Sequence, residues 1–270
     1  MASPTEITPQ QLARLIGTAD APALFDLRID SDFALDPHLI PGATRHRYDQ
    51  IIAAIPQING KAVLICHAGA KISQGAAAIL RSHGIMAETL MGGYLAWRAA
   101  DMPLIRAAAI PPVTHTNETL WVTRHRPKID RIACPWLIRR FIDPRARFLF
   151  VEPAQVEAVA DRFNATPFDM PGGFWSHRGD QCSFDTMLAE FGLQTPALDR
   201  LALIIRAADT NRHDLAPEAA GLLAASLGLS RIYRDDVAQM EAGLALYDAF
   251  YRWARDAQSE GHDWPAPVTQ

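Results

Sequence analysis

Short apolar runs alternate with helix-like segments over the first hundred residues. The runs at 23–25, 61–66 and 87–91 have the length of buried strands. Segments 48–55 and 72–84 lie between them and have the spacing of helices. Thr8, followed by Pro9 and Gln11, has the pattern of an N-cap with a capping box. This alternation predicts an α/β domain with a parallel sheet.

The pattern changes after residue 105. Residues 106–118 lose periodicity and contain two adjacent prolines, which favours an extended, semi-rigid connector. Strand-like runs follow at 120–124 and 147–151, then a helix from Pro153, and the chain becomes almost wholly helical after Ser183. We therefore expect a mainly helical α+β second domain. The predicted boundaries are a first domain at 1–106, a linker at 107–118, a second domain at 119–258 and a flexible tail at 259–270.

Composition narrows the class of protein. The chain has 270 residues, of which 49% are apolar and 21% charged, which excludes a disordered or collagen-like protein. A net charge of −4 gives no global attraction to nucleic acid or to an anionic membrane, and no apolar run approaches the roughly 20 residues that span a bilayer. Three cysteines without CxxC spacing make a disulfide framework unlikely to form. We expect a cytoplasmic protein with neither a membrane nor a nucleic-acid partner.

The first candidate site is the segment Cys66-His67-Ala68-Gly69-Ala70-Lys71, which joins a strand to a helix of small residues. A tight loop at a helix N-terminus points backbone N–H groups inward, where they stabilise an anion. Lys71 and a protonated His67 would add positive charge. This arrangement would favour a nucleophilic thiolate at Cys66, and the alternative is a buried, inert cysteine.

Four motifs in order extend this interpretation. They are Asp26-Leu27-Arg28, the segment 38–43 (HLIPGA), the six-residue loop 66–71, and Gly92-Gly93 followed by Ala96-Trp97. Together they make residues 5–105 resemble the rhodanese-like family. The resemblance implies a doubly wound α/β domain. It also implies a sulfurtransferase in which Cys66 takes sulfane sulfur from a donor such as thiosulfate and passes it to a thiol or cyanide, without a cofactor. It also implies anion binding by loop residues 67–71 and by Arg28.

The loop departs from the family where arginines are common, because His67 and Lys71 stand there. Lysine lacks the bidentate fork of arginine, so thiosulfate itself is expected to bind weakly. Phosphatase chemistry is disfavoured because Ile72 stands where the longer phosphatase loop would end in arginine.

A basic segment opens the second domain. Residues 121–147 hold eight of the 26 Lys and Arg residues against only Asp130 and Asp143. We expect an anion patch formed by Arg124, Lys128 and Arg131. The alternative is a solvated helical face whose arginines pair with acidic helices downstream.

A second cluster combines Asp169, His177, Cys182 and Asp185 with Asp209 and His213. Asp209 and His213 stand four residues apart in a predicted helix, so both side chains would lie on one face. With His177 from the preceding loop, they predict a divalent metal site. The alternative is an ordinary hydrogen bond near a helix end.

Long ordered blocks between 120 and 255, including KIDRIACPW and GDQCSFD, resemble the C-terminal domain of ChrB-type chromate-resistance proteins. This resemblance implies a role in chromate or oxyanion stress. The preferred hypothesis is a rhodanese-type sulfurtransferase fused to a chromate-resistance accessory domain, with a small-molecule sulfur donor, a thiol acceptor and chromate or another oxyanion as partners. Two alternatives are a chromate-sensing regulatory protein without sulfur transfer and a metalloenzyme in the second domain.

Overall fold

Strand β5 (Lys61–Ile65) sends alternate side chains into two separate cores. Ala62 and Leu64 pack into a cluster on one face of the sheet, and Val63 and Ile65 pack into a larger cluster on the other face. Successive side chains of a strand point to opposite faces, so a continuously apolar strand is buried on both sides. The computed structural model describes residues 5–261 of the chain.

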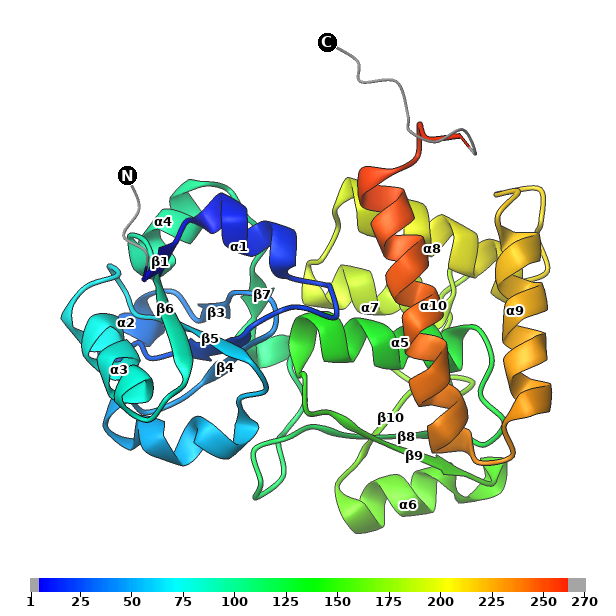
Figure 1. Ribbon diagram of the computed structural model, residues 1–270. Helices are drawn as coiled ribbons and strands as arrows, with labels where there is room; N and C mark the ends of the chain where they lie inside the picture. Colours follow the sequence, from blue (N-terminus) through cyan, green and yellow to red (C-terminus); the bar gives the residue numbers. More distant parts are fainter. Residues whose placement is uncertain (1–4, 262–270) are drawn as a thin grey trace.

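Five parallel strands form the sheet of the first lobe, in the order β1-β6-β5-β2-β4 (Figure 1). The bounds of the other four are β1 (Glu6–Ile7), β2 (Ala23–Asp26), β4 (Ala43–Arg45) and β6 (Met86–Leu90). A separate antiparallel pair joins β3 (His38–Leu39) to β7 (Ile105–Arg106). The short strands β1, β3, β4 and β7 were not predicted, because two or three residues show no periodicity.

Helices cover both faces of this sheet, which confirms the doubly wound prediction. The first-lobe helices are α1 (Pro9–Leu15), α2 (Asp30–Leu35), α3 (Lys71–Ser82) and α4 (Gly93–Ala99). Thr8 caps α1 with the predicted capping box to Gln11. The helix predicted at 48–55 is present as η1 (Tyr48–Gln57), a 3-10 helix that is kinked at Gln50 and contains Pro56.

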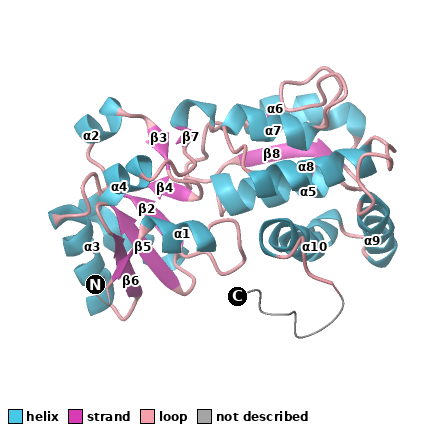
Figure 2. Ribbon diagram, turned by 90° about the horizontal axis from the view of Figure 1, so that it is seen from above, coloured by secondary structure: helices cyan, strands magenta, loops and turns pink. Residues whose placement is uncertain are grey.

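The second lobe places a small parallel sheet, ordered β10-β8-β9, among helices (Figure 2). Its strands are β8 (Leu120–Arg124), β9 (Arg147–Val151) and β10 (Thr166–Pro167). The helices are α5 (Asp130–Leu137), the π-helical turn η3 (Ile138–Ile142), η4 (Pro153–Gln155), α6 (Val156–Phe163), α7 (Ser183–Phe191), α8 (Pro196–Asp209), α9 (Ala219–Ile232) and α10 (Asp236–Asp256). The chain is mostly helical after Ser183, as predicted.

The two lobes share one core. The larger apolar cluster contains residues of α1 and α4 in the first lobe and of α5, α7, α8 and α10 in the second. The ring of Phe141 lies so close to Gly17 that a Cβ on this glycine would overlap it, and the N–H of Gly42 donates to the carbonyl of Phe141. The lobes are therefore packed directly together.

The connector is not extended throughout, which corrects the prediction for it. Residues Ala107–Ala109 form the 3-10 turn η2, and Val113 pairs with Thr119 across a turn at Asn117, whose φ is 58°. Arg145 donates to the carbonyl of Thr116. The connector therefore folds against the second lobe. Residues 262–270 of the predicted tail lie outside the described residues.

No helix in the described part of the chain is long and apolar enough to cross a membrane.

Candidate functional site

Cys66 directly follows β5, at the edge of the sheet where the parallel strands end. The strand's last carbonyl, that of Ile65, accepts a hydrogen bond from Leu27, so the ends of β2 and β5 are joined there. Residues 67–70 form a loop, and α3 begins at Lys71. The sequence thus places the cysteine where the carboxyl end of a strand meets the amino end of a helix, as predicted.

Two polar groups lie against the sulfur of Cys66. The backbone N–H of Ala70 donates to Sγ at 3.2 Å, and the hydroxyl oxygen of Ser73 lies 3.1 Å from Sγ. Cys66 is only 5% exposed, whereas Ala68, Ala70 and Lys71 are exposed. Of the predicted loop residues, Ala70 is the one whose contact places it against the sulfur.

The first turn of α4 is hydrogen-bonded to this loop. Tyr94 and Leu95 donate backbone hydrogen bonds to the carbonyls of Cys66 and His67, at 2.9 and 3.0 Å. Gly69 has a φ of 69°, and a Cβ there would lie 2.7 Å from the backbone nitrogens of Gly92 and Gly93. This close approach explains why the loop motif and the Gly-Gly motif occur together in the sequence.

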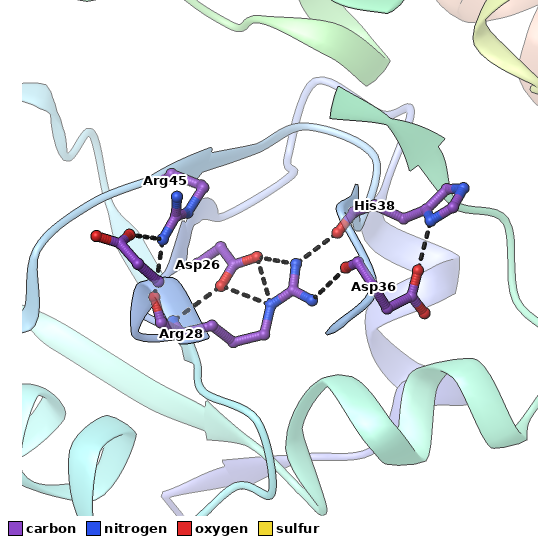
Figure 3. Close-up of polar contacts among 6 residues, drawn as sticks. Asp26, Arg28, Asp36, His38 and Arg45 are labelled. Atoms are coloured by element: carbon purple, nitrogen blue, oxygen red, sulfur yellow. Dashed lines mark hydrogen bonds and ion pairs between the residues drawn. The ribbon is translucent and has the colours of Figure 1, made fainter. Parts of the chain in front are cut away.

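Arg28 does not join the anion site, which corrects the assignment taken from the resemblance. Its side chain is fully buried and forms a bidentate ion pair with Asp26 (Figure 3). It also donates to the carbonyls of Asp36 and His38 and lies over the ring of Tyr94, 3.7 Å from its centroid. These contacts use the Nε, Nη1 and Nη2 donors of Arg28 inside the protein. Arg28 therefore stabilises the segment between β2 and β3.

Two partly exposed cations lie at the end of β4: Arg45 is its last residue, and Arg47 follows it. Arg45 pairs with Asp30 at 2.8 Å, and Arg47 pairs with Asp49 at 2.6 Å. These residues line a cavity of about 320 Å³. Both arginines are partly exposed, so they are accessible to solutes in a way that Arg28 is not.

In the second lobe, three carboxylates surround the imidazole of His177. Its Nε2 lies 3.2 Å from Oδ2 of Asp209, 3.5 Å from Oδ2 of Asp130 and 3.5 Å from Oδ1 of Asp169. Asp130 is the first residue of α5, Asp209 is the last residue of α8, and His177 lies in the loop before α7. Segments 79 residues apart thus converge on one point.

The carboxylates and the imidazole alter each other's protonation. Hydrogen bonds to Asp130, Asp169 and Asp209 raise the pKa of His177 well above its usual value. Burial raises the pKa of Asp130, whose side chain is 1% exposed. Burial also opposes ionisation of Asp169, but hydrogen bonds from His177, Arg124 and Ser183 outweigh it and lower the pKa of Asp169. The protonation state of each side chain in the cluster therefore depends on the charges of the others.

The predicted anion patch is largely neutralised. Arg124 and Arg131 both contact Oδ2 of Asp169, at 2.8 and 3.3 Å. The other arginines of the basic segment also have partners: Arg126 contacts Ser230, Arg139 contacts Glu241, Arg140 contacts Asp248, Arg145 contacts Thr116 and Arg147 contacts Glu118. Lys128 is half-buried. The alternative stated above, a basic face paired with acidic groups, describes this segment better.

Of the residues predicted to bind a metal, the structure brings His177 and Asp209 together and leaves His213 outside their group. Helix α8 ends at Asp209, and the chain turns at Asn211, whose φ is 56°. His213 therefore lies beyond the helix and outside the group of ligand atoms formed by Asp130, His177 and Asp209. Among the other residues of the predicted cluster, Cys182 is a buried N-cap of α7, and Asp185 accepts its backbone N–H.

Two residues of these sites were missed in the sequence. Ser73 is the third residue of α3, a position from which a side chain reaches back over the helix start. Asp130 follows Ile129, a β-branched residue with a φ of 41°. Tyr247 donates to the carbonyl of Ile129 at 2.9 Å, and Gln239 donates to that of Pro127 at 2.6 Å. These long-range contacts stabilise the backbone conformation that positions Asp130.

Comparison with known proteins agrees with this division of the chain. Residues 8–100 match the family model of the rhodanese-like domain, and residues 121–254 match that of the ChrB C-terminal domain. Protein ChrB of Cupriavidus metallidurans is 41% identical over 133 residues, which cover 48% of this chain and 39% of that protein. The chain thus spans well under half the length of this relative.

Solved structures similar to the first lobe include rhodanese-like proteins. A rhodanese-like domain protein from Staphylococcus aureus is 25% identical, with 34% of this chain and 90% of that chain covered and a TM-score of 0.31. A thiosulfate sulfurtransferase from Pseudomonas aeruginosa is 27% identical, with 37% and 19% covered and a TM-score of 0.31. On the two family-model matches, the chain joins a rhodanese-like domain at residues 8–100 to a ChrB C-terminal domain at residues 121–254.

Proposed function

We propose that the first lobe is a sulfurtransferase that carries sulfane sulfur as a persulfide on Cys66, and that it serves chromate or oxyanion resistance together with the second lobe. The observation that carries this proposal is the contact of Sγ with the N–H of Ala70 at the start of α3. A sulfur anion at this position receives a backbone hydrogen bond and the positive end of the helix dipole.

The transfer occurs in two displacements. The Cys66 thiolate attacks the outer sulfur of thiosulfate; a new S–S bond forms, and the sulfur–sulfur bond of thiosulfate breaks as sulfite leaves with the electron pair. An acceptor thiolate then attacks the terminal sulfur of the persulfide, which returns Cys66 to a thiolate. No external oxidant or cofactor enters either step.

The loop residues bind the donor in this scheme. The backbone of His67, Ala68, Gly69 and Ala70 supplies N–H groups, and the exposed Lys71 supplies a positive charge at the loop mouth. A lysine attracts an oxyanion without the bidentate geometry of arginine, so a persulfide donor fits this loop better than thiosulfate does. All three cysteines are free thiols. Because free thiols are typical of a reducing compartment, we place this chemistry in the cytoplasm.

The link to chromate rests on the second lobe, which is similar to part of Protein ChrB. Chromate is a tetrahedral dianion of the same shape as sulfate, so a loop that binds sulfur oxyanions accommodates it on electrostatic grounds. A regulator that binds DNA through the basic segment is less well supported, because the arginines of this segment are paired within the protein.

Intact-protein mass after incubation with thiosulfate, or with a small persulfide, tests the proposal. We expect the wild-type chain to gain one sulfur and peptide mapping to place it on Cys66, with none on Cys134 or Cys182, which are 0% exposed, whereas Cys66 is 5% exposed. The Cys66→Ser variant should gain none. A wild-type chain that gains no sulfur from either donor, or gains it in Cys66→Ser as well, contradicts the proposal.

A further inference from the structure

We propose that the second lobe binds one divalent transition-metal ion between Asp130, His177 and Asp209. This site lies in a different lobe from Cys66, and it is independent of the proposed sulfur transfer. One ligand atom from each residue lies within 4.8 Å of the other two.

The spacing of these atoms matches a metal coordination shell. Metal bonds of about 2.0–2.2 Å place neighbouring ligands of a tetrahedron roughly 3.3–3.6 Å apart. Nε2 of His177 lies 3.2 Å from Oδ2 of Asp209 and 3.5 Å from Oδ2 of Asp130. Two of the three ligand pairs therefore have the spacing of a coordination shell, and the ligand atoms of Asp130 and Asp209 lie within 4.8 Å of each other.

A second observation points to a missing positive partner. Asp130 is buried, and its Oδ1 has no hydrogen-bond partner among the described residues. A buried carboxylate oxygen without a partner is costly, because it has lost water and gained nothing in return. The other oxygen, Oδ2, accepts the backbone N–H of Ser183 at 2.6 Å, which fixes the carboxylate in the cluster. A metal ion bound by this carboxylate would compensate for its burial.

The surrounding charges also favour a cation. Asp209 ends α8, where the carbonyl end of the helix dipole attracts positive charge. Asp169 contributes a third carboxylate, but Arg124 and Arg131 occupy its Oδ2, and Ser183 donates to its Oδ1. Asp169 is therefore a positioning residue that holds the loop of His177 against the two ligand helices.

The donor set indicates the class of ion. One imidazole nitrogen and two carboxylate oxygens suit Mn²⁺, Fe²⁺ or Zn²⁺, whereas Ca²⁺ and Mg²⁺ prefer oxygen alone. The side chain of His177 is 40% exposed and that of Asp209 is 19% exposed. The ion would thus be open to solvent on one side, where a water molecule or a small anion completes its coordination.

Metal binding by the full chain tests this proposal. The protein is stripped with a chelator, dialysed free of it, and titrated with Mn²⁺ or Zn²⁺ while the bound metal is measured. Co²⁺ provides a second readout through its visible absorption. We expect one equivalent per chain for the wild type, and binding at least about tenfold weaker for Asp209→Asn and His177→Gln, since even the outer partners of metal ligands have effects of that size.

Two variants serve as matched controls. His125→Gln changes a histidine of similar exposure that also contacts a carboxylate, that of Glu152, and Asp214→Asn changes an exposed aspartate five residues after Asp209. Both should bind metal as the wild type does. Circular dichroism checks that each variant is folded. The proposal is wrong if the wild-type chain binds no equivalent of Mn²⁺, Zn²⁺ or Co²⁺, or if folded Asp209→Asn and His177→Gln bind as tightly as the controls.

Discussion

Gly93 lies directly against the backbone of Cys66. A Cβ at position 93 would overlap the carbonyl oxygen of Cys66 and the nitrogen of Gly69, and Gly93 has a φ of 61°. The next residue, Tyr94, donates its N–H to the same carbonyl at 2.9 Å. The conformation of the cysteine loop thus depends on a glycine 27 residues further along the chain.

Gly93→Ala should disable the loop. The methyl group cannot fit unless α4 or the loop moves, so we expect loss of persulfide formation and destabilisation by about 2 kcal/mol or more. Urea unfolding and the mass assay measure these two effects. Gly75→Ala is the control: Gly75 lies inside α3 with open space around it, and alanine favours a helix. If Gly93→Ala forms the persulfide at the wild-type rate, the loop does not need this close approach.

Ser73→Ala should slow the reaction of Cys66 without unfolding the protein. The hydroxyl lies 3.1 Å from Sγ, a contact in which either group can donate, and it also donates to the carbonyl of Ala70 at 3.2 Å. A thiolate at Cys66 can only accept, so this hydroxyl would then donate to it. Loss of a hydrogen bond to a charged group is worth about 1.5–3 kcal/mol, so we expect alkylation by iodoacetamide at neutral pH to slow about tenfold or more. Ser82→Ala removes an exposed hydroxyl from the end of the same helix and should leave the rate unchanged. Equal rates for both variants would exclude a role for Ser73.

Arg28→Lys should lower stability. Lysine cannot reproduce the bidentate pair with Asp26 or reach both backbone carbonyls, so a buried carboxylate loses part of its compensation. We expect destabilisation of about 2–4 kcal/mol in urea unfolding. Arg47→Lys, at an exposed pair with Asp49, should have little effect. If Arg28→Lys has wild-type stability but a raised KM for the sulfur donor, Arg28 binds the donor and its role is not structural.

Phe141→Ala should loosen the contact between the lobes. Its ring is buried against Gly17, Trp136 and Tyr251, and its loss leaves a cavity in the shared core. We expect destabilisation of about 3–5 kcal/mol and separation of one thermal unfolding transition into two. Calorimetry detects both changes. Phe163→Ala, at a residue that is 61% exposed, is the control. A single unchanged transition in Phe141→Ala would show that the lobes do not depend on this contact.

The contribution of Asp36 to the free energy of unfolding should decrease as the pH becomes acidic. Burial favours its neutral form, but interactions with Tyr94, His38 and Arg98 outweigh burial and lower the pKa of Asp36. A carboxylate with a lowered pKa stabilises the folded state above its unfolded pKa of about 3.9, and this contribution disappears as the pH falls through the folded value. We therefore expect Asp36→Asn to differ most from the wild type near pH 7, with the difference shrinking toward pH 3.

Urea unfolding at several pH values measures this difference. Asp30→Asn changes an aspartate whose side chain is 98% exposed and serves as the comparison, for which we expect a small difference from the wild type. A constant difference between Asp36→Asn and the wild type from pH 7 to pH 3 would contradict the assignment.

Adjacent residues by themselves determined the local structure of this chain. The capping box at Thr8 and Gln11, the buried strand at β5 and the start of α7 after Cys182 are all specified within a few positions, because caps and burial patterns depend on near neighbours. The place of the cysteine loop between a strand and the helix that follows it belongs to this group, whereas the conformation of the loop also depends on Gly93. The sequence also predicted both families, because their motifs are ordered runs of residues.

Tertiary structure alone decided which side chains meet. Arg28 carries a charge suited to an anion, yet a neighbouring carboxylate and two carbonyls bury it. His213 stands four residues after Asp209, yet α8 ends at Asp209 and His213 lies outside the cluster. Asp130, which precedes Asp209 by 79 residues, lies in the cluster with His177. These outcomes depend on how α5, α8 and the loop before α7 cross, and periodicity along the chain contains no information about that crossing.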